Sequence, residues 1–143
     1  MLSQKFFDDV AADVAAHEKT AQARKAAANT ARDFQGSVVD DVYPIAVDAQ
    51  NRLAPAITAT VKRNALGVEF MLEYLDGGSR NLVIGPGPVS GSVRFTENLG
   101  DATSLSGSNF YTSATWNPAV YEEELRKFIA SFVAGISTYG RPR

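Results

Sequence analysis

The chain has 143 residues, of which 45% are hydrophobic and 21% charged, and its formal net charge is -2. These values predict one globular domain spanning residues 1–143 and give no overall electrostatic reason to expect a nucleic acid or an anionic membrane as partner. The absence of cysteine excludes disulfides, thiolate metal sites and cysteine nucleophiles.

A long N-terminal helix is predicted over residues 1–34. Residues 3–33 contain neither glycine nor proline and are rich in alanine, the best helix former. Leu2, Phe6, Val10 and Val14 recur every four residues and form an apolar stripe. About 30 helical residues span roughly 45 Å, whereas a compact chain of this size is only ~35 to 40 Å across. We therefore expect the excess length to be covered by a partner, bent or frayed.

The charges on this helix are sorted along its length. Acidic residues occupy the first half and basic residues the second, which suits the helix dipole. The same sorting would let two copies lie antiparallel, with acidic half against basic half, in an isologous dimer. The candidate dimer face consists of Asp9, Asp13, Ala21, Arg24, Lys25 and Ala28.

An antiparallel sheet of five or six strands is predicted over residues 37–116. The first strand is expected at residues 39–47, where apolar residues alternate and Pro44 favours an edge position or a bulge. Alternation is clearest over residues 66–74, and a hairpin turn is expected at residues 76–78. Further strands are expected at residues 57–61, 82–84, 93–95 and 109–116.

A C-terminal amphipathic helix is predicted over residues 118–137. Asn117 and Pro118 are a helix start signal, an N-cap followed by a ring that fits the first helical position. Apolar residues then recur at helical spacing and would cover the sheet. The predicted fold class is therefore α+β, a two-layer sandwich of an antiparallel meander sheet with both helices.

Residues 85–91, Gly-Pro-Gly-Pro-Val-Ser-Gly, invite comparison with a phosphate-binding loop. Two prolines cannot donate hydrogen bonds, no lysine follows, and the next element is a strand rather than a helix. We interpret the segment as a connection between strands. It could still border a groove, with residues 98–108 on another side. The candidate pocket rim consists of Gly85, Gly87, Gly91 and Trp116.

The sequence contains no motif for catalysis, a cofactor or a metal. His17 is the only histidine and lies four residues after Asp13, as expected for a solvent-facing pair. No Gly-x-Ser-x-Gly elbow is present, and residues 69 and 73, four apart on a strand, would hold their carboxylates ~13 Å apart. No catalytic, cofactor or metal site is predicted.

Two hypotheses for function follow. The first is a non-enzymatic protein-interaction or assembly protein, expected to be homodimeric. The alternative is a small-ligand binding protein or enzyme with a pocket between sheet and helices. The acidic N-terminal segment is unlike a signal peptide, and no apolar run approaches ~20 residues. We therefore expect a soluble, cytoplasmic protein, although a signal-less secretion route stays open.

Overall fold

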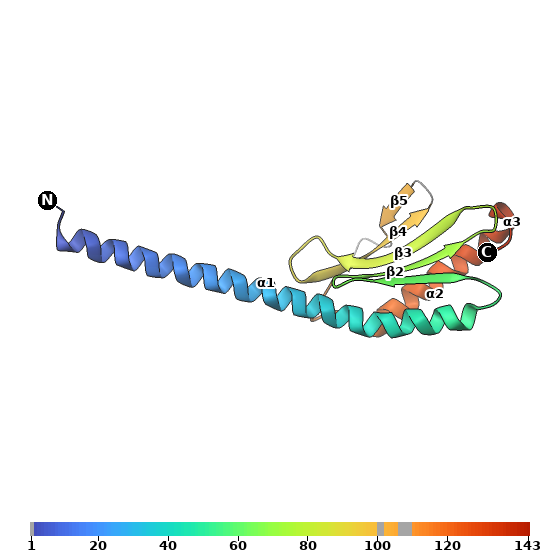
Figure 1. Ribbon diagram of the computed structural model, residues 1–143, viewed down its shortest axis with the longest axis horizontal. Helices are drawn as coiled ribbons and strands as arrows, with labels where there is room; N and C mark the ends of the chain where they lie inside the picture. Colours follow the sequence, from blue (N-terminus) through green and yellow to red (C-terminus); the bar gives the residue numbers. More distant parts are fainter. Residues whose placement is uncertain (1, 100–101, 106–109) are drawn as a thin grey trace.

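The computed structural model describes residues 2–99, 102–105 and 110–143, and the side chains of residues 99–109 are not described. One very long helix, a sheet and a shorter helix make up the fold (Figure 1). The helices are α1 (Gln4–Leu53), α2 (Pro118–Ala134) and α3 (Ile136–Tyr139). The strands are β1 (Ala59–Arg63), β2 (Val68–Glu73), β3 (Ser79–Pro86), β4 (Ser92–Leu99), β5 (Ala102–Leu105) and β6 (Tyr111–Thr112).

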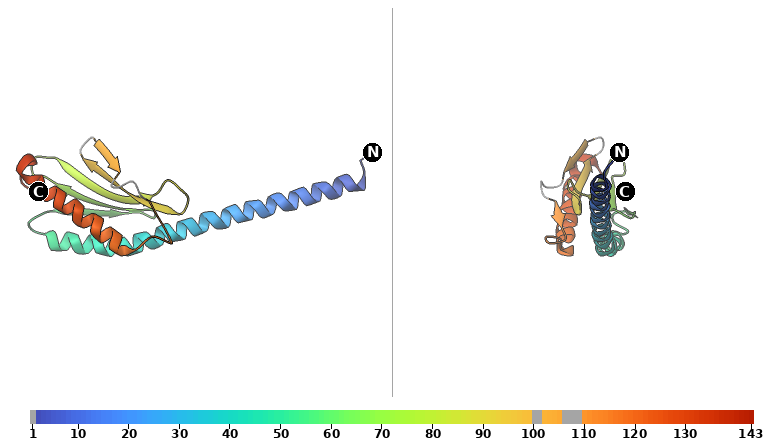
Figure 2. Two further views of the ribbon diagram at one scale, coloured as in Figure 1. Left: turned by 180° about the vertical axis from the view of Figure 1, so that it is seen from behind. Right: turned by 90° about the vertical axis from the view of Figure 1, so that its left-hand side faces the viewer.

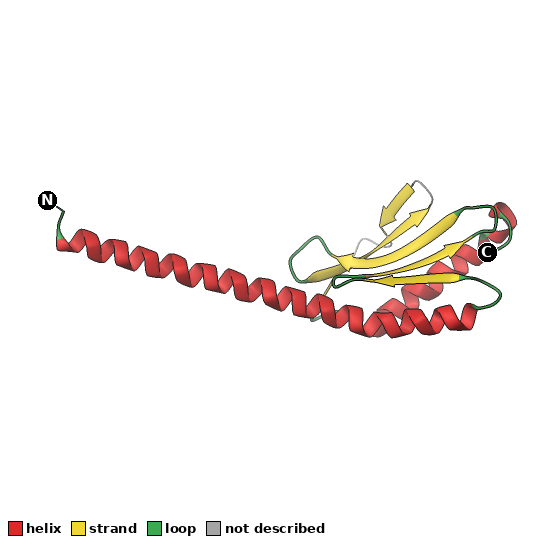
Figure 3. Cartoon of the chain, viewed as in Figure 1, coloured by secondary structure: helices red, strands yellow, loops and turns green. Residues whose placement is uncertain are grey.

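The sheet is antiparallel, as the sequence predicts. Its strand order is β1-β2-β3-β4-β5, and β6 pairs with β4. The C-terminal part of α1 and the whole of α2 lie on one face of the sheet (Figures 2 and 3). The predicted α+β class, with its long first helix, meander sheet and C-terminal helix, is confirmed.

The core lies between the sheet and these two helices. Alternation in β2 buries Val68, Phe70 and Leu72 and leaves the residues between them half-buried on the other face. α2 is held over the sheet by aromatic pairs, including the stacked rings of Tyr74 and Phe132 with centroids 4.2 Å apart. α1 contributes Val38, Val39, Val42 and Ala46.

The predicted end of the first helix at residue 34 is wrong, and so is the predicted strand over residues 39–47. α1 continues to Leu53 and includes Pro44, which is exposed. Val38, Val42 and Ala46 are spaced by four residues and become buried together. Burial of this helical face outweighs the strand preference of the β-branched residues. Gly36 is tolerated within the helix at a cost of about 1 kcal/mol relative to alanine.

The other predicted elements differ mainly at their ends. The hairpin turn before β3 is confirmed, with Gly77 at φ +98°. Residues 87–91 connect β3 to β4, as expected, and are called the β3–β4 turn below. Of the strand predicted over residues 109–116, residue 109 lies outside the described residues. The rest is a strand only in β6, because the chain turns at Thr112, whose carbonyl accepts from the amide of Trp116. The predicted helix over residues 118–137 is interrupted at Gly135.

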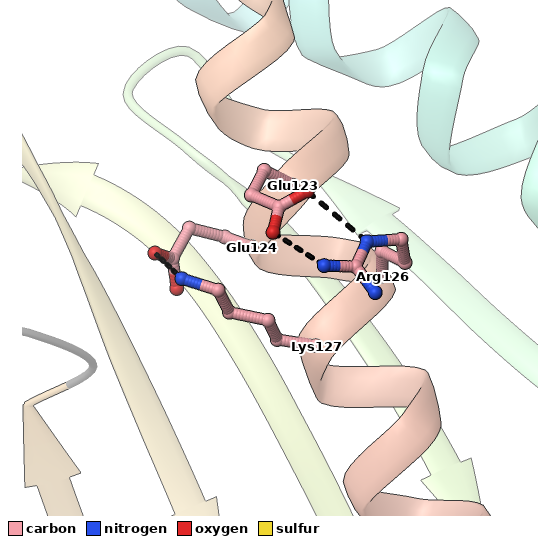
Figure 4. Close-up of polar contacts among 4 residues, drawn as sticks. All are labelled: Glu123, Glu124, Arg126 and Lys127. Atoms are coloured by element: carbon pink, nitrogen blue, oxygen red, sulfur yellow. Dashed lines mark hydrogen bonds and ion pairs between the residues drawn. The ribbon is translucent and has the colours of Figure 1, made fainter.

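Two ion pairs join residues three apart along α2 (Figure 4). Arg126 pairs with Glu123, and Lys127 pairs with Glu124 at 3.8 Å. The hydrogen bond from Arg126 lowers the pKa of the Glu123 carboxyl. Each of these glutamates therefore has a cation beside it three residues along the helix. The side chain of Glu123 is exposed, whereas that of Glu124 is only 17% exposed.

Candidate interaction surface

The N-terminal half of α1 projects away from the rest of the molecule (Figure 1). Every residue from 2 to 30 is exposed, and Ala31 is the first half-buried position. We call residues 2–30 the arm and the remainder of the fold the body. The helical part of the arm, from residue 4 onward, spans about 40 Å, whereas the whole of α1 spans about 75 Å.

A side-chain cap starts the arm. The hydroxyl of Ser3 accepts a 3.2 Å hydrogen bond from the backbone amide of Phe6. Such a cap satisfies one of the amides left unpaired at a helix start, and its removal typically costs about 1 kcal/mol. The cap and the alanine-rich composition explain local helicity. They leave the large apolar side chains of the arm exposed rather than packed against the body.

Large apolar side chains are concentrated at the start of the arm. Of the eleven exposed large hydrophobic residues in the described chain, five lie within residues 2–14. Phe6 and Phe7 form an edge-to-face pair with ring centroids 5.5 Å apart. The five are Leu2 at 61% exposure, Phe6 at 47%, Phe7 at 52%, Val10 at 43% and Val14 at 52%. Contiguous exposed apolar surface of this kind marks interaction sites.

These side chains lie on the face of α1 that becomes the core further along. Phe6 and Val42 are 36 residues apart, which is about ten turns of an ideal helix, so they point the same way. Val42 is fully buried, whereas Phe6 is not. The arm therefore continues the apolar face that the body covers from Ala31 onward.

The charged side chains of the arm form no ion pair with another described residue. None of the ion pairs in the described chain involves a residue before Asp40. In an ideal helix, all six residues of the predicted dimer face fall within about 160° of arc, on the same side as Phe6. All six are exposed: Asp9, Asp13, Ala21, Arg24, Lys25 and Ala28. The structure thus brings the predicted face together on one side of the arm.

The residues of the predicted pocket rim do not gather around one cavity of the described chain. Gly85 borders a cavity of about 690 Å³ between the β1–β2 connection and the end of β3. Gly87 and Gly91 lie in the β3–β4 turn, outside that lining. Trp116 donates from Nε1 to Asp41 on α1 at 3.2 Å. Of the second predicted border, residues 98–108, residues 100–101 and 106–108 lie outside the described residues, and only residue 98 has a described side chain.

A second cavity, of about 480 Å³, lies between the end of α2 and the β2–β3 hairpin. Its most distinctive side chain is Arg80, which pairs with Glu97 at 3.3 Å and is only 13% exposed. The buried Nε of Arg80 has no hydrogen-bond partner among the described residues. The rest of the lining includes Tyr74, Ser79, Ser131 and Tyr139.

Sequence reasoning missed Arg80. The signal was its register, because Arg80, Leu82 and Ile84 alternate along β3 on the side facing the helices. A charge in a core-facing position indicates either an ion pair or a binding role. The carbonyl groups at the C-terminus of α2 lie beside the same cavity and favour positive charge, which is consistent with the position of Arg80.

Among the described residues, no cluster of three or more histidine, cysteine or acidic residues is arranged to hold a metal ion. Among the helices described, none has an apolar stretch sufficient to cross a bilayer. His17 is exposed on the arm. Comparisons with protein-family models, curated proteins and solved structures gave no match to this chain.

Proposed function

We propose that this chain is a non-enzymatic assembly protein that forms a homodimer through its arm. The observation that carries the proposal is the unpartnered apolar face of residues 2–14, which lies in line with the buried face of α1. A helix whose apolar stripe is left in water is marginally stable by itself, because most helical stability in proteins comes from packing of that stripe.

Charge supports a second copy of the chain as the partner. Residues 2–18 carry one lysine and four acidic residues, a net charge of -3, whereas residues 19–32 carry four basic residues and no acid, a net charge of +4. Each half of the arm is thus complementary to the other half of a second arm. A two-fold dimer uses such self-complementarity twice.

The native mass tests this proposal. Light scattering over a range of protein concentrations should give twice the chain mass of 15.3 kDa. Because the interface is charged, the fraction of dimer should fall as ionic strength rises. A mass of one chain at all concentrations would contradict homodimerisation.

A charge-reversal cycle identifies the arm as the interface. Arg24→Glu with Lys25→Glu should weaken the dimer, because each copy then presents acids where its partner is acidic. Adding Asp9→Lys and Asp13→Lys should restore association. In the quadruple variant the four charges have opposite signs, so the basic positions 9 and 13 of one arm again face the acidic positions 24 and 25 of the other. Restored association would therefore show that these groups interact. If the quadruple variant stays as weak as the double variant, the sorted charges serve only the helix dipole.

A second candidate function is binding of a small ligand in the cavity at Arg80. The supporting observation is the buried Nε of Arg80 without an acceptor, in a cavity that tyrosine rings and serine hydroxyls also line. Titration with a metabolite library, followed by amide NMR shifts at Ser79 and Gly135, tests it. A saturable shift that Arg80→Gln abolishes would favour this function, and uniformly small linear shifts would exclude it.

A further inference from the structure

We infer that the two arms pair antiparallel in full overlap, with the two-fold axis near Glu18 and Lys19 and each N-terminus resting against the body of the other copy. This inference rests on the proposed homodimer and deepens it by assigning the orientation, the register and the surface that receives the N-terminus. We call that surface the collar, formed by Phe34 of α1 and Val89 of the β3–β4 turn.

The length of the arm sets the overlap. The β3–β4 turn is the part of the body that reaches furthest toward the arm (Figures 1 and 2). A Cβ at Gly91 would lie 3.8 Å from the Cβ of Ala31, so the turn closes the apolar face at that point. A second helix that packs on the apolar face of the arm must therefore end where the β3–β4 turn meets Ala31. The arm of another copy has the same free length, about 40 Å.

The positions of the charges give the same register independently. In full antiparallel overlap the numbers of opposing residues add up to about 37, which sets Asp13 against Arg24 on the shared face. Asp9 and Lys25 then come within about one turn of each other along the axis, at opposite edges of that face. In a parallel pair, each acidic half would face an identical acidic half, and each basic half a basic one.

Side-chain size agrees with the same register. Bulky apolar residues lie in the first half of the arm face, and the apolar residues of the second half are alanines. Full overlap sets Phe6 near Ala31, Val10 near Ala28 and Val14 near Ala21. Large side chains opposite small ones allow close-packed interdigitation of two helices. A parallel pair would instead place alanine on alanine along the second half, where little apolar area could be buried.

The collar then receives the N-terminus. Residue 2 lies opposite residues 34 and 35 in this register, so Leu2 reaches the boundary between arm and body. Phe34 is half-buried against the core, and Val89 is 47% exposed. Leu2 is the most exposed apolar side chain of the arm. These apolar groups would cover one another, and the core would extend into the dimer interface.

Cysteine cross-linking tests the orientation, since the chain has no cysteine of its own. Chains carrying Val10→Cys are mixed with chains carrying Ala28→Cys under mild oxidation. A disulfide needs Cα atoms within about 7 Å. We expect a disulfide-linked dimer in the mixture, containing one chain of each kind, and loss of this product when either chain is oxidised alone.

A second pair of cysteine substitutions tests the collar. Leu2→Cys chains mixed with Val89→Cys chains should give a mixed disulfide. Within one chain these positions lie at opposite ends of the arm, about 40 Å apart, so any such bond joins two molecules. Cross-linking of Val10→Cys with itself would overturn the antiparallel orientation while leaving the dimer intact. A dimer by mass in which the Leu2–Val89 pair fails would overturn the collar, and a monomer by mass would remove the proposed function itself.

Discussion

Gly91 of the β3–β4 turn approaches the backbone of α1 at Ala31, within 3.9 Å of its Cα atom as measured from an ideal Cβ position. Residue 30 and all described residues before it are exposed. One contact between two small residues therefore marks where the body ends and the arm begins. Gly91 also has φ +72°, in the left-handed region that favours glycine.

Gly91→Ala should destabilise the body. The cost is expected to be about 1 to 2 kcal/mol, because a left-handed conformation brings Cβ close to the following carbonyl oxygen. Gly85→Ala is the matched control, since a Cβ there meets open space and its φ is not positive. Urea unfolding followed by Trp116 emission measures both. Equal effects of the two substitutions would show that the backbone conformation at Gly91 does not matter.

Val10→Ser combined with Val14→Ser should abolish the dimer and leave the body intact. Both side chains are exposed within one molecule, and valine and serine have similar helix propensities. At concentrations too low for the dimer, the free energy of unfolding should change by no more than about 0.5 kcal/mol. Light scattering and urea unfolding provide the two measurements.

Serine substitutions on the opposite side of the arm are the control for this variant. The control carries Ala15→Ser and Ala26→Ser, and both residues lie about 180° around the helix from Phe6. The control should still dimerise, although serine lowers helix propensity relative to alanine. If the control also becomes monomeric, the helicity of the arm rather than its apolar face governs association.

Trypsin should cut the arm at a rate that depends on protein concentration. Lys19, Arg24 and Lys25 are exposed in the single molecule, and a solitary helix of about 27 residues opens readily. Pairing should bury this segment and slow cleavage as the protein becomes more concentrated. Mass spectrometry of early fragments identifies the cuts. A cleavage rate constant that does not change with concentration would contradict pairing through the arm.

The accuracy of the sequence predictions follows from how local each signal is. β2 and α2 were predictable because alternation and the Asn117–Pro118 start are properties of short segments. Residues 39–47 carry both an alternating and a helical apolar pattern, and the choice depends on burial of Val42 against other elements. Arg80 was missed because its partner, Glu97, comes from another strand. The free arm could be anticipated from length alone, but not where the body would end.

Tyr121 should make the protein less stable in alkali. Its side chain is fully buried, and its hydroxyl has no hydrogen-bond partner among the described residues. Burial raises the pKa of this hydroxyl above the ordinary value of about 10. Above a pH of about 10 the Tyr121 hydroxyl stays protonated in the folded protein but loses its proton in the unfolded chain. The free energy of unfolding therefore falls as pH rises beyond about 10, while the contribution of Tyr121 is constant at lower pH.

Tyr121→Phe removes this dependence. At neutral pH the variant should be as stable as the original chain or more stable by up to about 1 kcal/mol, because an unpaired buried hydroxyl is lost. Its advantage should grow as pH increases above about 10, where only the original chain must keep a buried phenol protonated. Urea unfolding followed by far-ultraviolet circular dichroism at neutral and alkaline pH measures the difference, and comparing the two chains cancels the other tyrosines and lysines. Parallel pH profiles would mean that the Tyr121 hydroxyl can ionise in the folded state as easily as in the unfolded one.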